Sequence, residues 1–118
     1  MTINQLEQLL RALTPPGRGH EKALQDEIAG ILTREKIGYM RERPLSAEDI
    51  PDFIVGGIVI EVKTAFSVQE VMRQLMRYAE HAAVAEIMLV TTLSKHRVLE
   101  KLSAPLNKKI RVIWVHAL

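Results

Sequence analysis

A two-glycine turn between two short apolar segments constrains this chain more than any other feature. The segment IPDFIVGGIVIEVKT, residues 50–64, has β-rich residues on both sides of Gly56 and Gly57. Two glycines between such segments predict a tight hairpin of antiparallel strands, because glycine accepts the backbone angles that these turns require. A two-residue turn also sets the strand register, and with it the face that each side chain occupies.

This register places three ionisable residues on one face of the hairpin. Counting from Val55 opposite Ile58, the pairing puts Asp52 directly opposite Glu61, with Cβ atoms about 4.5–5.5 Å apart. Lys63 follows Glu61 on the same face, because side chains alternate along a strand. The other face is apolar and is expected to be core: Phe53, Val55, Ile58, Ile60 and Val62. A longer turn would shift this pairing by one residue.

Opposed carboxylates predict a cation site. Two such groups repel each other unless one is protonated or a cation lies between them. Mg²⁺ and Mn²⁺ prefer oxygen ligands and keep several waters. Water on such an ion can be deprotonated near a lysine, and phosphoryl oxygens are drawn to the same ion. The hairpin therefore predicts a metal-dependent hydrolase of phosphodiesters.

The rest of the chain predicts a single α/β domain, residues 1–118, with one mixed sheet and helices on both faces. The composition, 47% hydrophobic and 25% charged, suits one globular core. The expected order is α-α-β-β-β-α-β-α-β. Periodicity and turn signals predict helices at about 3–13, 19–35, 67–84 and 94–103, and strands at 39–45, 52–55, 58–64, 86–92 and 111–118.

Composition excludes several classes of site. The chain has no cysteine, which excludes disulfides, thiolate metal sites and cysteine nucleophiles. No signal peptide and no run of about 18 apolar residues is found, so we expect a cytoplasmic protein without a membrane span. The net charge of +2 is compatible with binding a polyanion without indicating it. The histidines show no metal-ligand spacing and are expected to be structural or solvated: His20, His81, His96 and His116.

The charged residues of the hairpin also match a known motif. Pro51-Asp52, then eight residues, then Glu61-Val62-Lys63 resembles the motif of the PD-(D/E)xK nuclease superfamily. Members of that superfamily carry the motif on two neighbouring strands of an αβββαβ core, and the expected order over residues 19–92 is the same. The resemblance implies a restriction-endonuclease-like core with an extra N-terminal helix and a C-terminal helix and strand. It implies a Mg²⁺- or Mn²⁺-dependent deoxyribonuclease acting in repair, recombination, phage or restriction systems.

The resemblance also implies a role for each residue of the motif. Asp52 and Glu61 would ligate the metal together with the backbone carbonyl of Val62. Glu21, on the helix before the strands, would assist them, since many members carry a glutamate there. Lys63 would orient or activate the attacking water.

Two helical features extend the comparison. Glu27 competes with Glu21 for the position of the helical glutamate. RecB-like nucleases and lambda exonuclease add Gln-x-x-x-Tyr on the helix after the lysine strand, and Gln74 and Tyr78 resemble that pattern. Residues four apart share one helix face, and the resemblance implies that these two brace the site or contact the scissile strand.

DNA contacts are expected from arginines near the site. Arg41 and Arg43 lie on the first expected strand. Arg73 and Arg77 lie on the expected helix at 67–84, hereafter the motif helix, which also carries Gln74 and Tyr78. Residues 94–97 read SKHR. Such contacts give salt-dependent affinity without sequence preference. Aromatic residues make up only 4% of the chain, so no stacking platform for bases is expected.

Several alternatives remain open at this level. Singly, Asp52 suits a strand start after proline, Lys63 suits a side chain reaching the end of the sheet, and Glu21 suits a helix N-terminus. A non-catalytic DNA-binding or assembly module with the same fold is the main alternative function. A purely structural α/β protein would have to accommodate the buried charges without metal. An exonuclease, a flap or single-strand endonuclease and a junction-resolving enzyme are all compatible with the chain. Its small size favours a homodimer or a partner protein.

Overall fold

A five-stranded mixed sheet forms the centre of the fold. The computed structural model describes residues 2–14 and 21–116. The strands follow one another across the sheet in chain order; the first three are antiparallel neighbours, and the last two run parallel to the third. They are β1 (Met40–Arg41), β2 (Phe53–Val55), β3 (Ile58–Lys63), β4 (Glu86–Thr91) and β5 (Lys109–Trp114). The expectation of one mixed sheet is confirmed.

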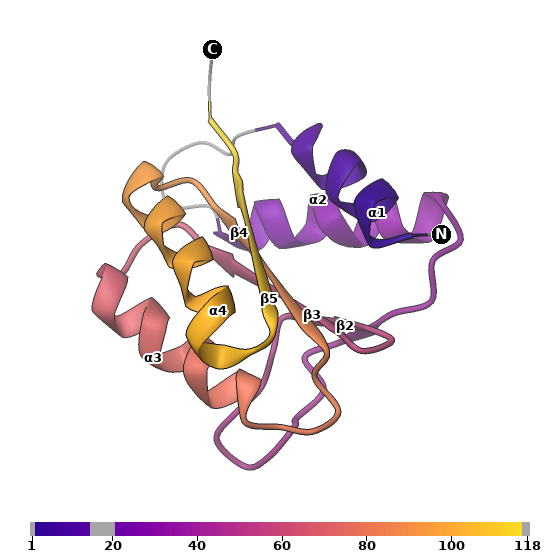
Figure 1. The fold of residues 1–118 in the computed structure, drawn as a ribbon. Helices are drawn as coiled ribbons and strands as arrows, with labels where there is room; N and C mark the ends of the chain where they lie inside the picture. Colours follow the sequence, from indigo (N-terminus) through magenta and orange to yellow (C-terminus); the bar gives the residue numbers. More distant parts are fainter. Residues whose placement is uncertain (1, 15–20, 117–118) are drawn as a thin grey trace.

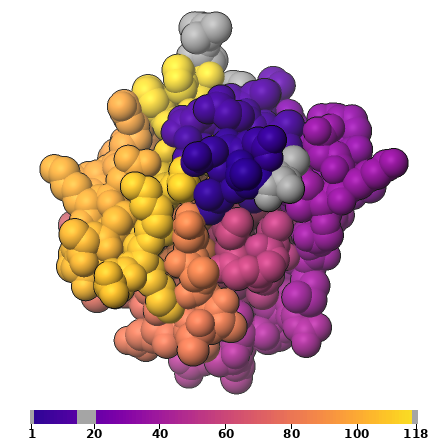
Figure 2. Space-filling model, turned by 45° about the vertical axis from the view of Figure 1, so that its right-hand side comes forward, coloured from indigo at the N-terminus to yellow at the C-terminus, as the bar shows by residue number. Residues whose placement is uncertain are grey.

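Helices cover both faces of this sheet. One face carries α1 (Ile3–Arg11) and α2 (Glu21–Arg34), and the other carries α3 (Val68–Ala79), the 3₁₀ helix η1 (Ser94–Leu102) and α4 (Ser103–Leu106), as Figure 1 shows. In the space-filling view α1 lies against β5 (Figure 2), where Arg111 Nη1 donates to Asn4 and Glu7. No helix within residues 2–14 and 21–116 has the length and apolar character needed to cross a membrane.

Alternation along β3 divides the core into two parts. Ile60 and Val62 pack with the apolar residues of α1 and α2, whereas Val59 packs with Leu75 of α3 on the opposite face. Glu61 and Lys63 share the α3 face with Val59, because successive side chains of a strand point to opposite faces. Both faces of the central strands are buried, so any charge on them needs a partner.

The hairpin register is confirmed. Val55 pairs with Ile58, and Phe53 pairs with Ile60. Gly56 adopts a φ of +59°, in the left-handed region that favours glycine. A Cβ on Gly57 would lie 3.1 Å from the Cβ of Ala85, a tight contact that would require a small shift of its neighbour. The backbone of Gly56 therefore supports the turn, and with it the register on which the charged face depends.

The expected helix starts agree with the structure. Thr2 caps α1 and forms a capping box with Gln5. The hydroxyl of Ser67 caps α3 by accepting the N–H of Glu70. Positions 19 and 20 of the second expected helix lie outside the described residues, as does His20.

Several expected boundaries are wrong. The first strand was expected at 39–45 and is limited to Met40–Arg41, because Glu42 takes a left-handed φ of +56°. The motif helix was expected to reach residue 84 and ends at Ala79. There the His81 carbonyl accepts from Lys108, and the chain turns. The helix expected at 94–103 is largely 3₁₀ rather than α. The last strand begins at residue 109 rather than 111 and ends at 114, and positions 117–118 lie outside the described residues.

Candidate active site

Asp52, Glu61 and Lys63 meet at the carboxyl end of β3. Lys63 Nζ lies 3.2 Å from Glu61 Oε2, and these side chains are only 12% and 4% exposed. The main-chain N–H of Asp52 donates to Glu61 Oε1 at 3.3 Å, while Asp52 Oδ2 accepts the N–H of Val62 at 2.7 Å. The structure therefore brings together the three residues that the hairpin register predicts.

Pro51 leaves the carbonyl of Val62 without a main-chain donor from the facing residue. Continued by two residues, the β2–β3 register places Pro51 opposite Val62. Because proline has no N–H, it offers no donor to the carbonyl of Val62. The N–H of Val62 is instead satisfied by the carboxylate of Asp52. The Val62 carbonyl is thus an oxygen ligand candidate beside the two acids.

Gln74 and Tyr78 connect helix α3 to Glu61. Gln74 Nε2 donates to the hydroxyl of Tyr78 at 2.9 Å, and this hydroxyl donates to Glu61 Oε1 at 3.0 Å. The carbonyl of Ile50 lies farther from the same hydroxyl, at 3.4 Å. Tyr78 is fully buried. The expectation that Gln74 and Tyr78 share a face is confirmed, and together they fix the orientation of the Glu61 carboxylate.

Burial raises the pKa of both acids, and other groups act on each of them differently. For Asp52, burial, followed by the charges of Glu61 and Glu21, raises the pKa from 3.8 to about 7. Burial also raises the pKa of Glu61, but Lys63 and Tyr78 oppose that shift by stabilising the carboxylate. Asp52 Oδ2 receives the Val62 N–H, whereas Glu61 receives donors on both oxygens. Lys63 and Tyr78 thus favour the charged form of Glu61, whereas burial and the neighbouring acids favour the protonated form of Asp52.

Glu21, rather than Glu27, lies on the side of the site. Glu21 is the first residue of α2, and its charge acts on Asp52. The carboxylate of Glu27 instead accepts the N–H of Thr14, which ties the end of the first segment to α2. Glu21 does not gather with Asp52 and Glu61 into a metal-binding group within the described ranges, so its assisting role stays a prediction.

The donor set fits a hard divalent cation. The carboxylates of Asp52 and Glu61 and the carbonyl of Val62 are oxygen ligands, which Mg²⁺ and Mn²⁺ prefer. Within the described ranges, no three His, Cys, Asp or Glu side chains gather into a metal-binding group. A cation at this site would therefore complete its coordination with a main-chain oxygen and with water.

Asp49 anchors the segment that leads to Asp52, and sequence reasoning missed it. Its carboxylate is almost fully buried and accepts from Arg77 Nε and His81 Nε2, each at 2.9 Å. The bond from His81 and the guanidinium of Arg77 hold the pKa of Asp49 below its usual range. Nothing in the sequence SAEDIPD distinguishes this acid from Glu48.

The four arginines expected to contact DNA have different surroundings. Arg77 is bound to Asp49. Arg41 Nη2 lies 2.7 Å from Asp26, and its guanidinium is 5.5 Å from the ring of Phe53. Arg43, on the chain after β1, and Arg73, on α3, are exposed, and the side chain of Arg77 is 47% exposed as well. Their contact with DNA stays a prediction.

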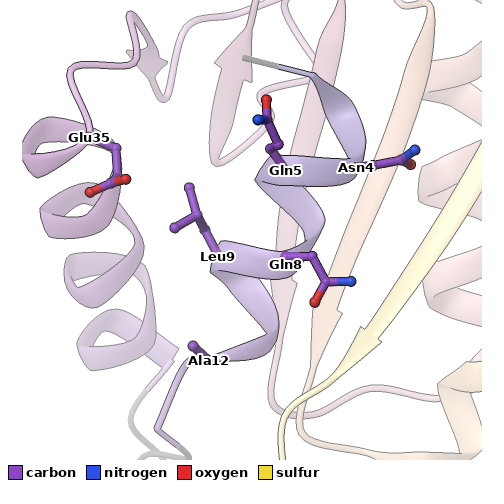
Figure 3. Close-up of a pocket in the computed structure, with 6 residues that line it drawn as sticks. All are labelled: Asn4, Gln5, Gln8, Leu9, Ala12 and Glu35. Atoms are coloured by element: carbon purple, nitrogen blue, oxygen red, sulfur yellow. The ribbon is translucent and has the colours of Figure 1, made fainter.

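Two hollows lie on different parts of the surface. A pocket of about 280 Å³, hereafter the site-side pocket, lies beside the catalytic candidates and is lined by Lys63, Phe66, Glu70, Val71, Gln74 and Arg77. A larger hollow of about 510 Å³ lies between α1 and the end of α2, where Leu9 and Glu35 point toward one another (Figure 3). Glu35 is the one titratable residue of its lining, so this larger hollow has no catalytic pair.

Comparison with known proteins adds no relative. No family model, no curated protein and no solved structure matches this chain. The α+β fold with its five-stranded mixed sheet is shown by the structure itself. Membership of the PD-(D/E)xK superfamily stays a prediction from residues 51–63 and the order of the elements.

Replacing Tyr78 with phenylalanine is expected to lower the free energy of unfolding by about 1–3 kcal/mol, because a buried hydrogen-bonding group loses its partner. The change removes the donor to Glu61 Oε1 and the acceptor for Gln74. Urea unfolding in chelator measures the effect. Tyr39→Phe is the matched control, since its hydroxyl bonds Thr33 in an exposed position. Equal losses in the two variants would contradict a special role for Tyr78.

Proposed function

We propose that this protein is a metal-dependent deoxyribonuclease with a restriction-endonuclease-like, PD-(D/E)xK core. One observation carries the proposal: Asp52, directly before β2, lies opposite Glu61 on β3, both acids are largely buried, and the Lys63 ammonium is 3.2 Å from Glu61. Buried acids are costly unless they are paired or bind a metal. One lysine beside two carboxylates leaves a deficit of positive charge, which a divalent cation would supply.

The residues of the site divide the chemical work. Asp52, Glu61 and the Val62 carbonyl would hold Mg²⁺ or Mn²⁺, with Glu21 assisting. The ion would supply Lewis-acid polarisation of a phosphoryl oxygen and would lower the pKa of water. Asp52 would hold the ion as its carboxylate, with its proton passing to water. Lys63 donates from Nζ to the attacking water or to a phosphoryl oxygen, which orients the water and stabilises negative charge.

The surrounding residues support this geometry. Tyr78 holds Glu61 by its hydroxyl, and Gln74 directs that hydroxyl by occupying its acceptor side. Arg73 and Arg43 are exposed and suited to phosphate contacts, which give affinity that falls with salt. The proposed substrate is DNA, bound through the phosphates of its backbone.

Cleavage assays test the proposal directly. Linear duplex, single-stranded and branched DNA are incubated with the protein in Mg²⁺, in Mn²⁺ and in chelator. We expect cleavage of at least one DNA with either ion and none in chelator, since the acids need the cation to act. Failure to cut any DNA with both ions, or equal cutting in chelator, would overturn the proposal.

A DNA-binding or assembly module without activity is the second candidate. It is favoured by the lack, within residues 2–14 and 21–116, of a cluster of three metal-binding side chains. This candidate predicts DNA binding that Mn²⁺ does not change and no cleavage with any ion. The same assays, together with the thermal response to Mn²⁺, therefore separate the two functions.

A further inference from the structure

Phe66 presents an exposed aromatic ring beside the candidate catalytic lysine. It lies on the loop between β3 and α3 and is 52% exposed. Among the exposed large apolar side chains of the described residues it is the aromatic one. The ammonium of Lys63 lies 5.0 Å from the centre of its ring. The ring is therefore about half accessible to solvent, next to the candidate catalytic lysine.

The backbone of Phe66 is strained. Its φ is +81°, which is uncommon for a residue other than glycine and unfavourable for a bulky one. Such conformations persist only where the surrounding structure holds them, and they cluster at functional sites. Other residues must therefore hold Phe66 in this conformation.

A buried histidine holds the strained residue in place. His96 is fully buried, and its Nε2 lies 3.0 Å from the carbonyl oxygen of Phe66. Because a carbonyl only accepts, Nε2 carries the proton and Nδ1 accepts from the hydroxyl of Thr91 at 2.7 Å. Burial lowers the pKa of His96, in agreement with this neutral form. One buried and one part-buried hydrogen bond of His96 thus hold the main chain that carries the exposed ring.

The site-side pocket has the size and polarity for a flat ring with a charged neighbour. Its volume of about 280 Å³ is below the roughly 300–1,000 Å³ of pockets that enclose whole small molecules. Phe66 lines it together with the amide of Gln74 and the cations of Lys63 and Arg77. Glu70 is its one acid, and that carboxylate accepts the Ser67 hydroxyl at the start of α3. A phosphate would therefore lie on the side of the two cations.

We propose that Phe66 and the site-side pocket bind one unpaired nucleotide of a DNA strand, with its base stacked on Phe66 and its phosphate toward Lys63 and Arg77. The inference rests on the proposed nuclease function and names its substrate class, DNA with unpaired bases such as a single-stranded end or flap. A base inside a duplex has both of its faces covered by neighbours, whereas an unpaired base is free to stack on an aromatic side chain. This proposal departs from the expectation, drawn from composition, that no stacking platform for bases is present.

Binding measured without cleavage tests the inference. Fluorescence anisotropy in chelator compares a single-stranded oligothymidine with a blunt duplex for the wild type, Phe66→Ala, Phe66→Leu and Phe66→Trp. We expect Phe66→Ala and Phe66→Leu to bind the single strand about 5- to 150-fold more weakly, the range for one base–aromatic stack. Phe66→Trp should bind it at least as tightly as the wild type, and duplex binding should change less than about twofold. Val98→Ala, which alters another exposed apolar side chain, is the matched control.

The outcomes separate this inference from the proposed nuclease function. Equal weakening on both DNAs, no weakening, or no wild-type binding to the single strand overturns the stacking site. A protein that cuts DNA with metal while Phe66→Ala binds like the wild type loses the inference and keeps the nuclease. Aromatic-dependent binding in a protein that cuts nothing keeps the stacking site and removes the nuclease. Thermal unfolding checks that each variant is folded, and Phe66→Trp carries the test if Phe66→Ala is not.

Discussion

Replacing Lys63 with alanine is expected to lower the rate of DNA cleavage by about 10²–10⁴-fold, the range for a positioned acid–base or charge-stabilising group. The ammonium lies beside Glu61 and is the largely buried cation next to the opposed acids. Its loss would remove the proposed donor to the attacking water or to the phosphoryl oxygen. The proposed ligand oxygens of Asp52, Glu61 and Val62 remain, so Mn²⁺ should still raise the thermal midpoint of the variant.

Single-turnover cleavage with saturating metal measures this effect on the chemical step. Lys101→Ala removes the same charge from an exposed position and should cleave within about twofold of the wild type. Lys63→Arg keeps the charge but replaces a compact ammonium with a planar group, and we expect it to recover little activity. A Lys63→Ala protein that cleaves within a few-fold of the wild type would remove Lys63 from the proposed mechanism.

The part of this site that sequence predicts is the part governed by local geometry. The Gly56-Gly57 turn sets a register over a few residues, and alternation then places Asp52, Glu61 and Lys63 on one face. Gln74 and Tyr78 are likewise related by one helical turn, and they are hydrogen-bonded. Each of these relations depends on backbone periodicity alone.

The contacts that sequence could not predict join residues far apart in the chain. Asp49 binds Arg77 and His81, which lie 28 and 32 positions away. Tyr78 reaches Glu61 over 17 positions. These bonds exist because α3 packs across the sheet at one particular angle and height. No local pattern encodes that placement, and the sequence offers many other acid–base pairs of equal chemical merit.

The sequence also does not predict backbone conformations that a residue type intrinsically disfavours. Glu42 takes a left-handed φ, which shortens β1, although its neighbours alternate like strand residues. Phe66 also has a positive φ, and its carbonyl is bound by His96, which lies 30 positions away in the chain. His96 was expected to be structural or solvated, and its buried position is structural. The hydrogen bond from His96 to the carbonyl of Phe66 joins residues that no local sequence pattern relates.

Replacing Asp52 with asparagine is expected to stabilise the metal-free protein at alkaline pH. The pKa of Asp52 is raised from 3.8 to about 7 by burial and by the charge of Glu61. The folded state therefore binds this proton more tightly than the unfolded state does. The resulting stabilisation is complete below about pH 3.8 and is lost as the pH rises through about 7. At about 1.4 kcal/mol for each pKa unit, the wild type loses at most about 4 kcal/mol across this range.

Asparagine carries no charge at any of these pH values, and its amide oxygen can still accept the N–H of Val62. The advantage of Asp52→Asn in free energy of unfolding should therefore be small at pH 4 and should grow toward pH 8, as measured by urea unfolding in chelator. Asp26→Asn is the control of opposite sign, because the hydrogen bond from Arg41 lowers the pKa of Asp26. Excess Mn²⁺ should reverse the order at pH 8: at about 100 times its dissociation constant it adds about 3 kcal/mol to the wild type, and a variant without the Asp52 carboxylate should gain far less. An advantage that does not change with pH would show that Asp52 is not the repelled acid. An equal response of the wild type and the variant to Mn²⁺ would show that Asp52 is not a metal ligand.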